Sequence, residues 1–201
     1  MLTKRFYEIY QVPLGPFEWM CQGLLDQIDK ERPVARLIFF KEEQNSQVYR
    51  HHWSILEEKV SKRYQESAPP VTYIAQKPLE GGLTLEVCYL ETDARHEIAY
   101  REHDQVVYTT ITSESGKELV IGGVIADDQT ENTFDQSTQI FKKIHSILDL
   151  EKMEVGTIIR QWNYIPGITS VNEGKQNYHE FNRARSRFYG SCNWTHGYPA
   201  A

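Results

Sequence analysis

The stretch FDQSTQIFKKIHSILDL, residues 134–150, predicts an amphipathic helix and sets the frame for the second half of the chain. Its apolar residues recur at helical spacing and form one stripe: Phe134, Ile140, Phe141, Ile144, Ile147 and Leu148. Residues 157–165, TIIRQWNYI, follow as a predicted strand that ends at Pro166-Gly167. Residues 176–189 then predict a last helix, with Gly190 as its C-cap glycine.

Upstream of this unit the pattern alternates between strands and a helix, so the sequence predicts an α+β fold. The expected strands are residues 37–40, 71–75, 83–90, 106–111 and 119–125, and the expected helix is 49–64. Ser115-Gly116 supplies the turn of a hairpin between the last two strands. We expect the first ~30 residues to be irregular, because Pro13, Gly15 and Pro16 interrupt any regular element. The segment 91–102, predicted to be a turn rich in charges, is the expected seam between a domain at 1–100 and a domain at 101–201.

Composition places the chain among ordinary globular proteins, with 40% hydrophobic and 25% charged residues. The formal net charge of −6 lacks the basic surplus typical of nucleic-acid binders. No apolar run approaches the roughly 20 residues that span a bilayer, and the N-terminus lacks the apolar stretch of a signal peptide. The three cysteines are far apart, which argues against a disulfide framework. We therefore expect a cytoplasmic protein that binds neither nucleic acid nor membrane.

The last predicted helix carries the residues that suggest a binding site. Tyr178, Asn182, Arg185 and Tyr189 share one of its faces. Arginine binds carboxylates through two parallel hydrogen bonds, and tyrosine can pack against a cyclic substrate. On the preceding strand, Arg160, Trp162 and Tyr164 lie on one side of the pleat and Gln161 and Asn163 on the other. The alternative reading is a solvated arginine-rich surface with half-buried tyrosines.

Other chemistry has little support in the sequence. The seven histidines lack metal-ligand spacing, so we predict no metal and no cofactor. We find neither a nucleophile elbow nor a phosphate-binding loop. Gly122-Gly123 lies in a strand pattern and is typical of a β-bulge or a close backbone approach. Cys192, beside a helix end, is either a reactive thiol or, as is more usual, an incidental one.

Two segments resemble the chorismatase family, also described as pteridine-dependent deoxygenase-like. They are RQWNYIP, residues 160–166, and YHEFNRAR, residues 178–185, and the terminal YPAA at 198–201 also fits. That family releases pyruvate from chorismate and forms a hydroxybenzoate or a dihydroxycyclohexadiene carboxylate. The resemblance implies that Tyr178, Arg185 and Tyr189 line a chorismate pocket, and leaves Asn182 and Trp162 as either scaffold or ligand contacts. From the strand geometry we also expect Arg160 and Trp162 to face this pocket.

A weaker similarity over residues 134–189 points to the RidA (YjgF) fold. The resemblance implies an N-terminal α/β lobe followed by an incomplete RidA-like, chorismate-mutase-like sheet packed with two helices. The family's acid/base glutamate and last strands should follow Ala201, so we expect a truncated and inactive chain whose catalytic residues are unknown. The missing segment or self-association would then complete the sheet. The alternative function is a non-catalytic module that binds a small carboxylate.

Overall fold

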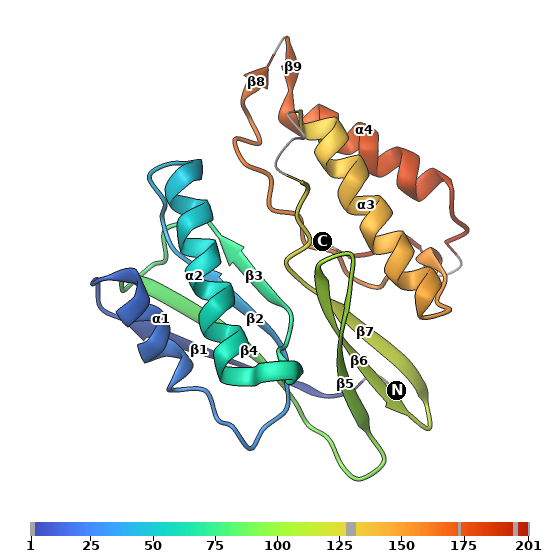
Figure 1. Cartoon of the computed structure of the whole chain (residues 1–201). Helices are drawn as coiled ribbons and strands as arrows, with labels where there is room; N and C mark the ends of the chain where they lie inside the picture. The colour runs from blue at the N-terminus through green and yellow to red at the C-terminus, as the bar shows by residue number, and fades with distance from the viewer. Residues whose placement is uncertain (1–2, 128–131, 173, 195–196, 201) are drawn as a thin grey trace. The chain divides into compact units, whose positions relative to one another are not determined.

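The computed structural model describes residues 3–127, 132–172, 174–194 and 197–200, and confirms the predicted α+β class (Figure 1). The chain divides into two compact units, Met1–Gly123 (unit 1) and Val124–Ala201 (unit 2). The division into domains at 1–100 and 101–201, which the sequence analysis expects, stays a prediction. No helix in the described ranges is long and apolar enough to cross a bilayer.

Unit 1 is built on a four-stranded sheet in the order β1-β4-β2-β3. The strands are β1 (Arg5–Val12), β2 (Val34–Phe40), β3 (Val71–Ile74) and β4 (Leu83–Leu90). β4 is antiparallel to both of its neighbours, whereas β2 and β3 are parallel. The parallel pair requires a crossover, which α2 (Ser46–Tyr64) provides. With α1 (Phe17–Leu25), α2 covers one face of the sheet (Figure 1).

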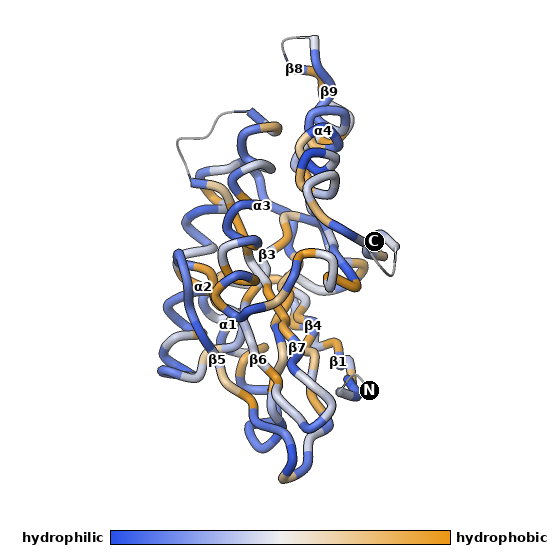
Figure 2. Tube along the Cα trace, turned by 90° about the vertical axis from the view of Figure 1, so that its right-hand side faces the viewer, coloured by the Kyte–Doolittle hydropathy of each residue, from blue (hydrophilic) through white to orange (hydrophobic). Residues whose placement is uncertain are grey.

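The main core of unit 1 lies between this sheet and the two helices. Met20 and Leu24 of α1, Phe39 of β2 and Leu56 of α2 are fully buried there. The Asn45 side chain caps α2 by accepting hydrogen bonds from the amides of residues 47 and 48. The hydrophobic stretches drawn in orange in Figure 2 gather in the strands, while much of α2 is hydrophilic.

The other face of the sheet packs against three further strands of unit 1: β5 (Glu97–His103), β6 (Val106–Ser113) and β7 (Gly116–Ile121). Ala35, Cys88 and Leu90 form one buried cluster with Ile111 across this interface. β1 lies at the edge of the four-stranded sheet and leaves Ile9 67% exposed.

Unit 2 is a helix pair with irregular connections. α3 (Thr133–Leu150) and α4 (Asn177–Gly190) pack through Phe141, which stacks on Phe188 with ring centroids 4.7 Å apart. Phe181 lies at a tilt against the same ring at 6.2 Å. The hairpin β8 (Val171–Asn172) and β9 (Lys175–Gln176) precedes α4. Two 3₁₀ turns complete the elements, η1 (Gln65–Ser67) in unit 1 and η2 (Val155–Thr157) in unit 2.

Four local predictions were wrong. The first 30 residues form β1 and α1, because Pro16 lies at the N-cap of α1 and therefore does not interrupt it. The segment 91–102 was expected to be a charged turn, but it contains most of β5; its place as the seam between two domains stays a prediction. Residues 157–165 form no strand and contribute one β-bridge among the described residues, Arg160 to Ala200. Gly190 is the last residue of α4, and the C-cap is Ser191 in a right-handed helical conformation.

The predicted hairpin is confirmed, although β7 ends at Ile121. The RidA-like character of the C-terminal half remains a prediction.

Candidate functional site

Arg185 lies on a different side of α4 from the helix's other two arginines. Arg183 pairs with Glu180 at 3.0 Å and lies 4.0 Å from the Phe134 ring centroid, and Arg187 lies 4.8 Å from the same centroid. Arg185 is half-buried over Phe181 at 5.3 Å and has no ion-pair partner among the residues that the structure describes. Its planar donors are thus available to a ligand carboxylate.

Tyr189 is the neighbour of Arg185 one turn further along α4. Its hydroxyl donates a hydrogen bond to Oε1 of Gln161 at 3.1 Å, and its ring stacks on Tyr198 at 5.4 Å. Burial raises the pKa of Tyr189, and the positive charge of Arg185 opposes that shift. The phenol is therefore protonated at neutral pH and acts as a hydrogen-bond donor beside the guanidinium.

The segment before α4 is attached to this end of the helix through Gln161. Its backbone amide donates to the Ala200 carbonyl at 2.9 Å, and its side-chain amide donates to Asn163 at 2.7 Å. Arg160 and Trp162 are both exposed, and the guanidinium of Arg160 lies 5.3 Å from the indole centroid. Arg160 and Trp162 therefore lie in the segment that contacts Tyr189, but Gln161 makes the contact.

Tyr178 lies near the opposite end of α4. Its ring is 46% exposed and tilts against His179, and its amide donates to the Ile168 carbonyl at 3.0 Å. Seven residues separate it from Arg185, which is about 10 Å along a helix axis. The structure thus groups Arg185 with Tyr189 and leaves Tyr178 two turns away, on the same helix but without a contact to either among the described residues.

Sequence reasoning missed several parts of this cluster. Gln161 was assigned to the other side of the pleat, yet it is the residue that meets Tyr189. Trp194 packs on the Tyr189 ring at 4.8 Å and donates to its carbonyl at 2.8 Å, and no motif marks it. Asn182 keeps a buried Oδ1 that has no hydrogen-bond partner in the described part of the chain. The helical spacing had placed Asn182 on the site face of α4, but it gave no sign of this unpaired oxygen.

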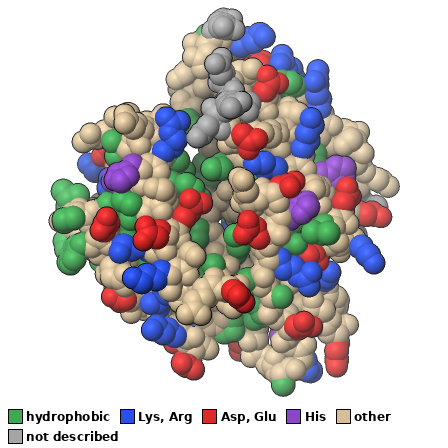
Figure 3. Space-filling view, in the orientation of Figure 1, with side chains coloured by type: hydrophobic (Ala, Val, Ile, Leu, Met, Phe, Trp, Pro, Cys, Tyr) green, Lys and Arg blue, Asp and Glu red, His purple; other side chains and the backbone are tan. Residues whose placement is uncertain are grey.

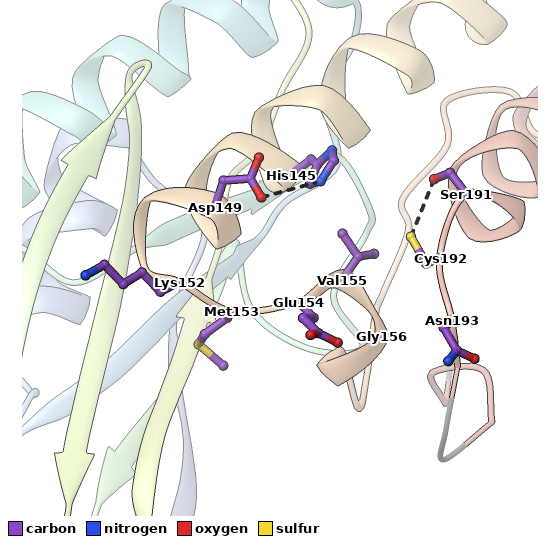
Figure 4. Close-up of a pocket in the computed structure, with 10 residues that line it drawn as sticks. All are labelled: His145, Asp149, Lys152, Met153, Glu154, Val155, Gly156, Ser191, Cys192 and Asn193. Atoms are coloured by element: carbon purple, nitrogen blue, oxygen red, sulfur yellow. Dashed lines mark hydrogen bonds and ion pairs between the residues drawn. The ribbon is translucent and has the colours of Figure 1, made fainter.

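A hollow of about 410 Å³ lies beside the C-terminal end of α4, and none of the predicted site residues lines it (Figure 4). His145 and Asp149 of α3 form one wall, with their side chains 3.6 Å apart. Cys192 forms the opposite wall, and its thiol donates to the Phe188 carbonyl at 3.4 Å. Within the described ranges, no group of three or more His, Cys, Asp or Glu side chains could hold a metal ion.

The chain matches a model of a known protein family. The family model described as "Chorismatase FkbO/Hyg5-like, N-terminal" matches residues 89–201, which is more than half of the chain and includes all of α3 and α4. No curated protein and no solved structure matches the chain.

Proposed function

Because the chain belongs to the chorismatase FkbO/Hyg5-like family, whose function is of the chorismatase type, we propose that α4 binds chorismate for the release of pyruvate. The products would be pyruvate and a hydroxybenzoate or a dihydroxycyclohexadiene carboxylate. The proposal concerns the substrate and the residues that hold it. Arg185 binds a substrate carboxylate, Tyr189 donates a hydrogen bond beside it, and Trp162 and Arg160 flank the ring.

One observation carries this proposal. Arg185 is a half-buried guanidinium without an ion-pair partner among the described residues, next to the protonated phenol of Tyr189, inside the matched segment. Partly desolvated arginines normally have an acidic partner, because leaving the charge unpaired away from water is costly. Here the side chains beside the Arg185 guanidinium are the aromatic rings of Phe181 and Tyr189. A cyclic carboxylate would supply both the missing anion and a ring to pack on them.

Binding can be tested by titrating the 201-residue protein with chorismate in a calorimeter. We expect Arg185→Gln to weaken binding by about 10- to 100-fold, because a hydrogen bond to a charged group contributes roughly 1.5–3 kcal/mol. Arg183→Gln is the matched control, since Arg183 lies on the same helix but pairs with Glu180. Equal affinities for the two variants would remove the assignment of Arg185.

Turnover is measured separately by following pyruvate with a lactate dehydrogenase couple. Splitting the enolpyruvyl ether requires a general acid, whose carboxyl group usually has a raised pKa. In the matched segment, the pKa values of the Asp93, Glu118 and Asp127 carboxyl groups are lowered, so none of these three suits the role of the acid. A second candidate function is a module that binds a small carboxylate without chemistry. Chorismate binding without pyruvate formation at high protein concentration would decide for it.

A further inference from the structure

The strand β1 leaves one edge of the four-stranded sheet of unit 1 without a neighbouring strand among the described residues. Its pairing with β4 runs without a bulge from Arg5 to Val12, so the open edge is continuous over the whole strand. No proline interrupts this strand. Proteins usually protect an open edge with a bulge, a proline or a free charge, because its unpaired backbone groups attract other strands. The first two protections are missing in β1.

The hydrogen bonds to β4 identify the residues of β1 whose backbone groups point outward. The Glu91 amide donates to the Lys4 carbonyl at 3.0 Å, in the register of the β1–β4 pair. In an antiparallel pair, residues that bond to the neighbour alternate with residues whose backbone groups face away. Even-numbered residues of β1 therefore bond to β4. The odd-numbered ones, among them Tyr7, Ile9 and Gln11, direct their amides and carbonyls to the open edge.

The same three residues have exposed side chains without charge. Ile9 is 67% exposed, Tyr7 is 52% exposed, and Gln11 is also exposed. Charged side chains of both signs are spread over the face of the molecule drawn in Figure 3. An exposed row of an aromatic, an aliphatic and an amide side chain along an open strand is therefore a departure from the charged surface that keeps proteins apart.

The two charged residues of β1 do not protect the edge either, because each already has a partner in its own chain. Arg5 pairs with Glu118 at 2.8 Å, and Glu8 pairs with Arg32. Both charges are thus neutralised locally, so neither repels an approaching strand as a free lysine or glutamate would. The third usual protection is missing as well.

The register of a second, antiparallel copy of β1 follows from these residues. Outward-facing residues must meet outward-facing ones, which leaves two registers that keep the strands centred on each other. One places Glu8 directly opposite Glu8 of the other copy, and like charges in that position are destabilising. The other places Ile9 opposite Ile9, Tyr7 opposite Gln11, and Glu8 opposite Tyr10, so it brings no like charges together.

We propose that the open edge of β1 pairs with β1 of a second copy of this chain, around a two-fold axis at Ile9. The two four-stranded sheets would then join into one continuous sheet. The contact bonds the free backbone groups of both strands and removes both Ile9 side chains from water. A second copy fits because the register is self-complementary, as a two-fold contact requires. The surface belongs to unit 1, so the proposal stands independently of the chorismate site on α4.

Sedimentation velocity of the 201-residue chain tests the pairing. We expect a monomer–dimer equilibrium between about 1 and 200 µM, and Ile9→Lys should weaken the dimer at least about tenfold because two lysines would face each other. Leu150→Lys is the matched control, since Leu150 is 55% exposed and lies at the end of α3. Equal weakening by the two variants would overturn the proposal. A monomer at every concentration would also overturn it and leave the edge to a strand of a different protein.

Disulfide cross-linking tests the register. The background is Cys192→Ser, because Cys21 and Cys88 are buried. Facing residues in a bonded antiparallel pair have Cα atoms about 5.5 Å apart, within the roughly 4.4–6.8 Å that a disulfide spans. Ile9→Cys should therefore give a covalent dimer on a non-reducing gel after oxidation. Tyr7→Cys should not, because its two copies lie roughly 13 Å apart along the strands. An equal or higher yield from Tyr7→Cys would exclude this register and with it the proposal.

Discussion

Replacing Glu43 with glutamine tests a buried carboxylate of unit 1. The Glu43 side chain is 2% exposed and accepts hydrogen bonds from the Tyr73 hydroxyl, from Nδ1 of His52 at 2.6 Å and from Nζ of Lys41 at 3.2 Å. Phe17 stacks on His52 with ring centroids 3.9 Å apart, so the carboxylate links β3 and α2 to α1. Glu43→Gln keeps the shape of the side chain, but its amide NH₂ group is itself a donor and faces the donors of Tyr73, His52 and Lys41.

The expected loss of stability at neutral pH is about 3 kcal/mol, because breaking a buried ion pair by changing one partner costs roughly 3–5 kcal/mol and glutamine keeps one acceptor. Burial alone would raise the pKa of Glu43, yet the hydrogen bonds from Tyr73, His52 and Lys41 hold it below the ordinary value of 4.5. A carboxyl group with a lowered pKa stabilises the fold above about pH 4.5. That contribution is lost as pH falls through the folded-state pKa, so the two proteins should converge in acid.

Urea unfolding followed by circular dichroism at several pH values from 7 to 3 measures this difference. Glu42→Gln is the control, since Glu42 is the exposed neighbour whose backbone carbonyl, not its side chain, contacts Lys41. Glu42→Gln should match the unmodified chain within about 0.5 kcal/mol. The role given to the buried carboxylate would be refuted if Glu43→Gln lost as little stability as Glu42→Gln. It would also be refuted if the loss of stability in Glu43→Gln stayed constant down to pH 3.

Three further substitutions test the backbone and the second core, each by urea unfolding. Gly123→Ala should cost more than about 2 kcal/mol, because its Cβ would meet the Val71 carbonyl oxygen and φ is positive; an unchanged midpoint would contradict the close approach. Gln65→Gly should stabilise unit 1 by about 0.5–1 kcal/mol through release of strain at φ 54°, and any destabilisation would count against that strain. Phe141→Ala should cost about 3–5 kcal/mol, because the ring is 3% exposed and stacks on Phe188; a loss below about 1 kcal/mol would show that the helix pair does not depend on it.

The elements that sequence reasoning found are those whose signals are local. The α3 and α4 helices were predicted because Phe141, Phe181 and Phe188 recur at helical spacing, and these same rings form their contact. The proximity of Arg185 to Tyr189 was also local, since the two are one turn apart on a helix.

The elements that were missed or wrongly predicted depend on distant partners. β1 pairs with β4, about 80 residues away, and its register joins Arg5 to Leu90. β5 has charged residues along its length, which hides its alternation. Residues 157–165 have the composition of a strand, but a strand needs a neighbour, and this segment has one bridge. The Gln161–Tyr189 hydrogen bond likewise depends on tertiary placement that no spacing rule gives.

The strand order of unit 1 has a consequence for synthesis on the ribosome. β4 is the central strand that both β1 and β2 need, yet it leaves the exit tunnel after them. Until residue 90 has emerged, the apolar side chains of β2 have no antiparallel partner and the nascent chain presents them to its surroundings. Such late, long-range pairing makes folding slow and exposes intermediates to aggregation, so chaperone supply and translation speed should govern the yield of this protein more than its final stability.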